Sequence, residues 1–198
     1  MLAYFITHPD VLIDPAVPVP QWRLSPRGLD RMAKIARQPW VATLERIYCS
    51  EEQKAIDGAA VLAGLCPAAV VRLAELGEND RSATGYLPKH EFEAVVDEFF
   101  RRPEVNVRGW ETAAAAQARI VRAIRQASAE AGPARVIAVV NHGGVGGLLM
   151  CHLKRAGVSR RKDQPAGAGG NFFAFEMPLE RLLQPWQPID PPSTFDAA

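Results

Sequence analysis

Two histidines in this chain follow apolar runs that have the character of buried β-strands. His8 comes directly after residues 2–7 (Leu-Ala-Tyr-Phe-Ile-Thr), and His142 follows residues 135–141 (Arg-Val-Ile-Ala-Val-Val-Asn). Runs of this composition without polar alternation are typical of strands buried on both faces of a mostly parallel sheet. Such sheets bind ligands beyond the carboxyl ends of their strands. The sequence therefore predicts that both imidazoles reach one crevice, provided that the two strands are neighbours.

The residues beside these histidines suit the chemistry of a phosphoryl group. His142 is followed by Gly143 and Gly144 at a predicted strand-to-helix turn. Glycines let backbone N–H groups approach a ligand there, and a helix N-terminus favours an anion. A ring nitrogen of His8 can attack phosphorus and form a phosphohistidine, while His142 donates to a phosphoryl oxygen. The pattern predicts phosphoryl transfer through a covalent intermediate.

This reaction also needs a proton donor and positive charge. A carboxylic acid must protonate the leaving oxygen, and Glu75 and Glu78 both lie in a predicted loop after a strand. Cations that stabilise the phosphoryl oxygens are available from Lys54, Arg23 and Arg81. Residue types alone do not choose among them.

Strands and helices alternate along the chain, which predicts an α/β fold with helices covering a sheet. Strands are expected at residues 2–7, 46–48, 68–73, 135–141 and 171–177. Helices are expected at residues 25–37, 51–65, 91–101, 111–131 and 145–155, with Ser25 and Ser50 as N-caps of the first two. We expect a three-layer α/β/α architecture with a mostly parallel central sheet. A single domain should span residues 1–184, followed by a poorly ordered, Pro-rich tail at residues 185–198.

Composition narrows the class of protein. The chain has 198 residues, of which 48% are hydrophobic, enough for one sizeable core. A net charge of +1 does not indicate a nucleic-acid or membrane surface. The three cysteines lack Cys-x-x-Cys spacing, and neither a signal peptide nor a membrane-length apolar run is evident. We therefore expect a cytoplasmic protein whose partner is a small molecule.

Five segments in order resemble the histidine phosphatase superfamily, which has the phosphoglycerate mutase-like fold. They are Phe5-Ile6-Thr7-His8-Pro9, Leu24-Ser25-Pro26-Arg27-Gly28, Ile47-Tyr48-Cys49-Ser50 with Lys54-Ala55, Val140-Asn141-His142-Gly143-Gly144-Val145, and Asn171-Phe172-Phe173-Ala174-Phe175. The resemblance covers most of the chain. It implies metal-independent hydrolysis of a phosphomonoester without a cofactor, with His8 as nucleophile and His142 as its partner. Leu76-Gly77-Glu78 is similar to the family's Leu-x-Glu and favours Glu78 as the acid, although Leu73-Ala74-Glu75 fits the same pattern.

The chain departs from this family at the phosphate-binding positions. The family's arginine before the nucleophile is Thr7, its following glycine is Pro9, and its second phosphate-binding arginine is Lys54. Arginine grips phosphate with two donors, whereas lysine is a point charge and threonine is neutral. Losing one such donor costs roughly 2.7–4 kcal/mol of transition-state stabilisation. We expect reduced activity, with Thr7, Lys54 and Gly143 lining the phosphate pocket and Arg23 as a substitute cation.

Two other functions fit the same residues. The first is non-catalytic binding of phosphorylated ligands on the same scaffold. Alternatively, His8 and Asp10, a His-x-Asp pair, hold a divalent metal together with His142 in a metal-dependent phosphoesterase. Hydrolysis is preferred to mutase chemistry, because a mutase must shield its phosphoenzyme from water and no segment indicates such closure. The loops at residues 9–20 and 75–89 are expected to select the substrate.

Overall fold

A six-stranded sheet forms the centre of the molecule. The computed structural model describes residues 1–165, 169–179 and 181–190. Across the sheet the strands lie in the order β3 (Ala69–Arg72), β2 (Arg46–Cys49), β4 (Val136–Asn141), β1 (Leu2–Thr7), β5 (Asn171–Glu176) and β6 (Arg181–Pro188). The pairs β3–β2, β2–β4 and β4–β1 are parallel, whereas β5 is antiparallel to both β1 and β6. The predicted mostly parallel sheet is confirmed.

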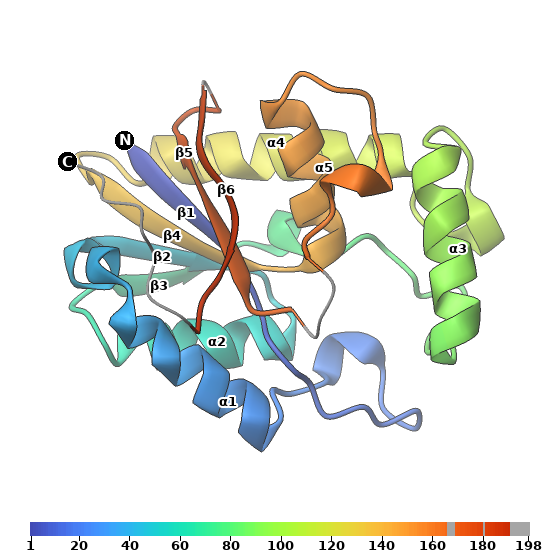
Figure 1. The fold of residues 1–198 in the computed structure, drawn as a ribbon, viewed down its shortest axis with the longest axis horizontal. Coiled ribbons are helices and arrows are strands. Elements are labelled where there is room, and N and C mark those ends of the chain that lie inside the picture. Colours follow the sequence, from blue (N-terminus) through green and yellow to red (C-terminus); the bar gives the residue numbers. More distant parts are fainter. Residues whose placement is uncertain (166–168, 180, 191–198) are drawn as a thin grey trace.

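Helices cover both faces of this sheet (Figure 1). The helices α1 (Pro26–Ala33) and α2 (Gln53–Ala63) lie on one face, and α4 (Ala113–Glu130) and α5 (Gly143–Leu153) lie on the other. The helix α3 (Lys89–Arg101) stands to one side, beyond the ends of the strands. The architecture is therefore the three-layer α/β/α fold that the alternation of elements predicted.

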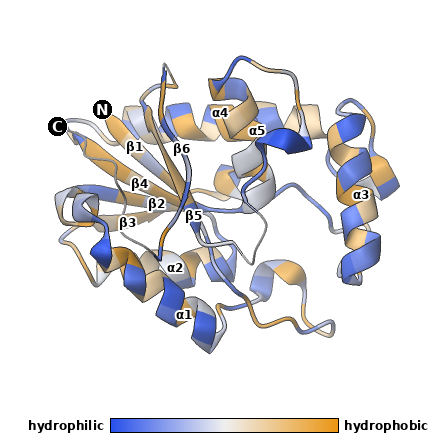
Figure 2. Cartoon of the chain, viewed as in Figure 1, coloured by the Kyte–Doolittle hydropathy of each residue, from blue (hydrophilic) through white to orange (hydrophobic). Residues whose placement is uncertain are grey.

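The core has two parts because successive side chains of a strand point to opposite faces. Tyr4 and Ile6 of β1 pack in the cluster that includes residues of α1 and α2. Ala3 and Phe5 of the same strand pack in the cluster that includes residues of α4 and α5. In Figure 2 the central strands β1 and β4 are largely hydrophobic and lie between helices of mixed character. Burial on both faces explains why these strands show no polar alternation.

Local sequence signals fix how the first helix starts. The Ser25 hydroxyl accepts a hydrogen bond from Gly28 N at 3.0 Å, and Pro26 occupies the first turn of α1. Gly28 is required there, because a Cβ atom would lie 2.1 Å from the carbonyl oxygen of Asp10. This close approach packs the chain that follows His8 against α1.

Two details differ from the sequence-based expectations. The residue that caps α2 is Glu52 rather than Ser50, whose hydroxyl lies in the site described below. Residues 185–188, expected to begin a poorly ordered tail, complete the edge strand β6, and Trp186 packs against Phe173 with ring centroids 4.6 Å apart. Proline is tolerated in this strand because it lies at the edge of the sheet. The rest of the predicted tail, residues 191–198, lies outside the described residues.

The helices within the described residues do not include one long and apolar enough to cross a membrane.

Candidate active site

The two histidines meet at the carboxyl edge of the sheet. Strands β1 and β4 are parallel neighbours with Thr7 opposite Asn141, so the residue after each strand leaves the sheet at the same level. The His8 backbone N–H donates to Asn141 O at 2.9 Å. The imidazole rings of His8 and His142 lie with centroids 5.2 Å apart in an edge-to-face arrangement. The predicted convergence of these residues is confirmed.

His8 is held in an orientation suited to nucleophilic attack. Its Nδ1 lies 2.9 Å from the carbonyl oxygen of Pro9. A carbonyl oxygen can only accept, so Nδ1 carries the ring proton and the lone pair is on Nε2. Burial, reinforced by the neighbouring charge of His142, lowers the pKa of His8 to about 3. The imidazole is therefore neutral and nucleophilic throughout the physiological range.

His142 is buried, and its Nε2 is the ring nitrogen that neighbouring side chains hold. Its Nε2 lies 2.7 Å from Ser50 Oγ and 3.4 Å from Glu52 Oε1. Burial lowers the pKa of His142, although Glu52 and Glu78 oppose this. Its Nδ1 has no hydrogen-bond partner within the described part of the chain. When the Ser50 hydroxyl donates to Nε2, the ring proton sits on Nδ1, which is then available to a phosphoryl oxygen.

Glu52 is a charged residue of this site that the sequence analysis did not select. Its Oε2 lies 2.5 Å from Lys54 Nζ, and its Oε1 accepts from the Glu78 N–H at 2.8 Å. Burial disfavours the carboxylate, but the charges of His142 and Lys54 outweigh it and lower the pKa of Glu52 to about 2. Lys54, itself buried, also donates to Val19 O at 2.9 Å. The cation expected to bind phosphate is thus paired internally.

Glu78 lies at the N-terminus of α5. Its two carboxylate oxygens accept from the backbone N–H groups of Gly144 and Val145, each at 3.0 Å. Burial favours the protonated form, but Arg81 and His142 outweigh it and lower the pKa of Glu78. The carboxylate is therefore ionised before a substrate binds, whereas an acid catalyst must be protonated when it acts. It occupies the helix terminus expected to hold an anion.

Arg119 of α4 holds the loop that carries Glu78. Its guanidinium donates to the carbonyl oxygens of Glu75 and Gly77 at 2.8 Å and of Glu78 at 3.0 Å. It is itself paired with Glu111 at 2.7 Å. Four acceptors on one planar group fix the loop relative to α4, so Glu78 is positioned rigidly.

Arg81 supplies a second cation in the lining of the cavities beside His8. Its guanidinium carbon lies 5.1 Å from the ring centroid of Phe92 and 5.6 Å from that of Trp110. Stacking on aromatic rings orients arginine without consuming its hydrogen-bond donors. Of the three cations considered from the sequence, Arg81 lines both cavities beside His8, Lys54 lines one of them and Arg23 lines neither.

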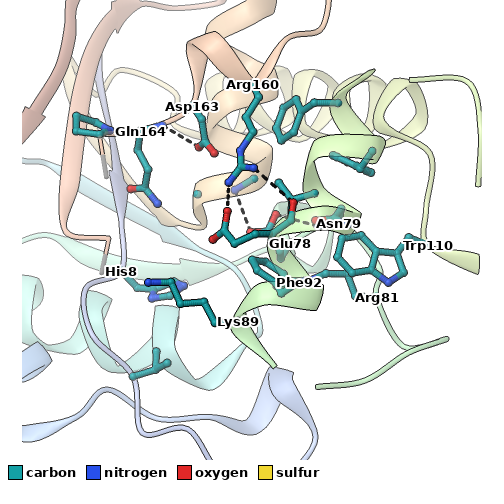
Figure 3. A pocket seen from close by; sticks show the side chains of 18 of the residues that line it. His8, Glu78, Asn79, Arg81, Lys89, Phe92, Trp110, Arg160, Asp163 and Gln164 are labelled. Atoms are coloured by element: carbon teal, nitrogen blue, oxygen red, sulfur yellow. Dashed lines mark hydrogen bonds and ion pairs between the residues drawn. The ribbon is translucent and has the colours of Figure 1, made fainter. Parts of the chain in front are cut away.

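Two adjoining cavities open on His8 and share Val11, Arg81, Lys89 and Phe92. The larger, the polar chamber, has a volume of about 870 Å³ and is lined by residues that include Glu78, Asn79, Glu93, Arg160, Asp163 and Gln164 (Figure 3). The smaller, the apolar chamber, has a volume of about 290 Å³ and is lined by residues that include Val11, Ile13, Val19, Trp22, Tyr86 and Leu87. Gly143 lines the polar chamber and Lys54 the apolar one. His8 therefore borders one chamber lined by both charged and apolar side chains and one lined mainly by apolar side chains.

Two of the expected site residues lie elsewhere. Arg23 is largely exposed and pairs with Asp57 at 3.3 Å, and it does not line either chamber. Thr7 is fully buried, and its hydroxyl donates to Gln164 Oε1 at 2.7 Å. Gln164 in turn approaches Gly143, where a Cβ atom would lie 2.3 Å from its Nε2. An amide side chain thus occupies the space between Thr7 and the start of α5, a role that the local sequence does not signal.

Glu75, the alternative acid, and Asp10, the alternative metal ligand, each pair with an arginine. Glu75 is half-exposed, pairs with Arg122 at 3.5 Å and lies outside both chambers. Asp10, the second residue of the metal hypothesis, is bound by Arg31 at 2.8 Å. Within the described residues, no group of three or more His, Cys, Asp or Glu side chains is arranged to hold a metal ion.

Comparison with known proteins identifies the family. Residues 19–168 match the model of the histidine phosphatase superfamily (branch 1). The chain belongs to this superfamily. The matched segment contains Lys54, Glu78 and His142 and begins after His8. Comparison with curated proteins finds no match.

Solved structures share the superfamily fold at low sequence identity. A mycobacterial glucosyl-3-phosphoglycerate phosphatase is 16% identical with a TM-score of 0.72, and the match covers 94% of this chain and 95% of that one. A putative alpha-ribazole-5'-P phosphatase from Escherichia coli is 18% identical with a TM-score of 0.67, covering 93% and 94%. YhfR from Bacillus stearothermophilus is 16% identical with a TM-score of 0.71, covering 92% and 94%. These likenesses establish the phosphoglycerate mutase-like fold.

Proposed function

We propose that this protein is a metal-independent phosphomonoesterase that works through a phosphohistidine on His8. The observation that carries the proposal is the geometry of His8, whose Nδ1 is held by the Pro9 carbonyl and whose neutral Nε2 lies beside His142. Membership of the histidine phosphatase superfamily supports the same chemistry.

In the first half-reaction His8 Nε2 attacks phosphorus and the P–O bond to the alcohol breaks. His142 and Arg81 stabilise the charge on the phosphoryl oxygens, together with Lys54. Glu78, once protonated, gives its proton to the leaving oxygen. In the second half-reaction a water oxygen attacks phosphorus, the P–N bond breaks, and the water proton passes to the Glu78 carboxylate. Phosphate leaves and the enzyme is restored.

Glu78 must gain a proton before the first step, because its carboxylate is ionised in the free site. A bound phosphate dianion supplies the reason for this uptake, since a like charge nearby raises the pKa of a carboxyl group. The same carboxylate, ionised after the alcohol has left, is the base for the second step. Gln164 contributes to the wall of the polar chamber and is held there by the Thr7 hydroxyl, and Gly143 lets the Gln164 amide approach closely.

A second candidate is a non-catalytic phospholigand-binding protein. The internal pair of Lys54 with Glu52 favours it, because a cation already neutralised contributes less to transition-state stabilisation. A phosphoenzyme distinguishes the two functions.

The deciding experiment is a screen of phosphomonoesters on the purified protein, with vanadate as inhibitor. It is followed by chemical trapping with a ³²P-labelled substrate. Turnover should be inhibited by vanadate, and an acid-labile, base-stable label should appear on the wild type and be absent from His8→Ala. His90→Ala is the matched control, because His90 is exposed and outside both chambers. Binding of orthophosphate without turnover or label would establish the second candidate, and label retained in His8→Ala would exclude His8 as the nucleophile.

A further inference from the structure

The apolar chamber beside His8 points to the class of alcohol that the substrate carries. Its walls are the side chains of Val11, Ile13, Val19, Trp22, Tyr86 and Leu87, with Phe92 at the border with the polar chamber. The rings of Trp22 and Tyr86 lie 5.8 Å apart at an interplanar angle of 55°. Ile13 is 62% exposed and Tyr86 37% exposed, so apolar surface is presented to solvent at this chamber. Such a concave apolar surface next to a nucleophile is typical of a ligand site.

The charged groups at this chamber all have one sign. Among the described residues that line it, the ionisable side chains besides Tyr86 are the cations Lys54, Arg81 and Lys89 and the neutral imidazole of His8. No carboxylate, amide or aliphatic hydroxyl side chain is found in that part of its lining. A ligand that fits is anionic where it meets His8 and Arg81 and apolar where it meets Trp22 and Tyr86.

This lining is unsuited to a sugar or another polyol. Each hydroxyl that leaves water without a hydrogen-bond partner costs free energy, and the apolar walls offer few partners. In the polar chamber, by contrast, two of the polar side chains are already engaged. Arg160 pairs with Glu93 and Asp97, and Gln164 receives the Thr7 hydroxyl.

We propose that the leaving group of the substrate is an aromatic or similarly apolar alcohol bound in the apolar chamber against Trp22 and Tyr86. This inference rests on the proposed phosphomonoesterase function and adds the substrate class. Roughly 150 Å³ of apolar cavity is enough to bind benzene. The chamber, at about 290 Å³, holds a group of one or two rings.

The test compares esters whose leaving alcohols are all primary, so that intrinsic reactivity is similar. The set is 2-phenylethyl phosphate, propyl phosphate and glycerol 3-phosphate. Burial of one aromatic ring should raise kcat/KM for the phenylethyl ester about tenfold to a hundredfold over the glycerol ester. Tyr86→Ala and Trp22→Ala should each remove most of this preference. Tyr86→Phe should keep it because the ring remains.

A remote control is Leu29→Ala, an exposed apolar position on α1 outside both chambers. It should retain the preference of the wild type. Circular dichroism checks the folding of each variant. If Trp22→Ala fails to fold, Tyr86→Ala still tests the proposal, since Tyr86 lies in a half-exposed loop position.

A binding assay separates failure of this inference from failure of the proposed function. Calorimetry measures 2-phenylethylphosphonate, propylphosphonate and orthophosphate, none of which can be turned over as an ester. If no ester is hydrolysed but the phenylethyl compound binds more tightly and Tyr86→Ala abolishes the difference, the phosphatase proposal fails and the apolar subsite stands. If turnover is found with equal or higher kcat/KM for glycerol 3-phosphate, the subsite is wrong and the phosphatase proposal stands.

Discussion

Glu52 and Lys54 form an ion pair inside the candidate site, with Glu52 Oε2 2.5 Å from Lys54 Nζ. The same carboxylate lies 3.4 Å from Nε2 of His142. Lys54 and His142, which the proposed function assigns to the phosphate, are therefore already in contact with the Glu52 carboxylate. A phosphate that enters this site must compete with Glu52 for Lys54, and the two negative charges repel each other.

Replacing Glu52 by glutamine should strengthen phosphate binding. The substitution removes the competing charge and leaves an amide of nearly the same shape, so Lys54 can turn to the ligand. The pKa of Glu52 is about 2, so its charge cannot be removed by mild acid and must be removed by substitution. We expect the Kd for orthophosphate, measured by calorimetry, to fall about tenfold.

Glu51→Gln is the matched control for this variant, because Glu51 is adjacent but exposed. It should bind orthophosphate as the wild type does. Weaker binding in Glu52→Gln would mean that Glu52 orients Lys54 and His142 for the ligand instead of competing with it.

Loss of Glu78 should harm esters with poor leaving groups most. An alkoxide needs a proton as it departs, whereas an activated aryl oxide needs little help, and general acid catalysis contributes on the order of a hundredfold or more. We expect Glu78→Gln to lower kcat for an alkyl phosphate by about that factor and for 4-nitrophenyl phosphate much less. The measurement is the ratio of the two rates in each variant.

Glu75→Gln serves as the control, since Glu75 lies outside both chambers and pairs with Arg122. A selective loss in Glu75→Gln with a normal Glu78→Gln would reverse the assignment. The pH profile gives a second readout. The lowered pKa of Glu78 keeps its carboxyl group ionised in the free site, so the acid form becomes more populated only as pH falls. Hydrolysis of the alkyl ester should therefore rise toward acid in the wild type but not in Glu78→Gln.

The partly buried imidazole of His8 should make the fold less stable in acid. Its folded-state pKa of about 3 lies below the ordinary value of 6.5, so between these values the unfolded chain binds the extra proton. The stability contributed by neutral His8 is therefore complete above pH 6.5 and is lost progressively as pH falls toward 3. One such proton gives a slope of up to about 1.4 kcal/mol per pH unit.

Urea unfolding at about pH 7 and about pH 4.5 measures this slope. The wild type should lose more free energy of unfolding between the two conditions than His8→Asn does, because the variant has no imidazole to protonate. His90→Asn, at an exposed position, should behave as the wild type. Equal losses in wild type and His8→Asn would show that His8 is not held neutral by the fold.

Chelators should leave the activity unchanged. The proposed reaction assigns the phosphoryl oxygens to His142, Lys54 and Arg81, and Asp10 is engaged by Arg31. Overnight treatment with EDTA followed by desalting should therefore preserve kcat for any ester that the protein hydrolyses. Loss of turnover that a divalent metal restores would support the metal-dependent alternative built on His8, Asp10 and His142.

The sequence by itself determined the elements and placed each histidine at the carboxyl end of a strand, whereas the pairing of these two strands came from the tertiary structure. Apolar runs at residues 2–7 and 136–140 lack polar alternation because both faces of the sheet are covered, so they are readable as buried strands without knowledge of the partners. Parallel strands place their carboxyl ends at one edge, so His8 and His142 could be assigned to one crevice. Those are consequences of local pattern and general geometry.

Only the tertiary structure decided which charges surround these histidines. Glu52 looks in the sequence like a favourable charge at the start of a helix, yet its carboxylate pairs with Lys54 and approaches His142. Arg23 and Arg81 are equivalent as residue types, but Arg23 pairs with Asp57 in solvent whereas Arg81 is stacked on Phe92 beside the cavity. Electrostatic partners depend on distances through space, and these are set by the packing of segments far apart in the chain. The order of residues carries no local signal for them.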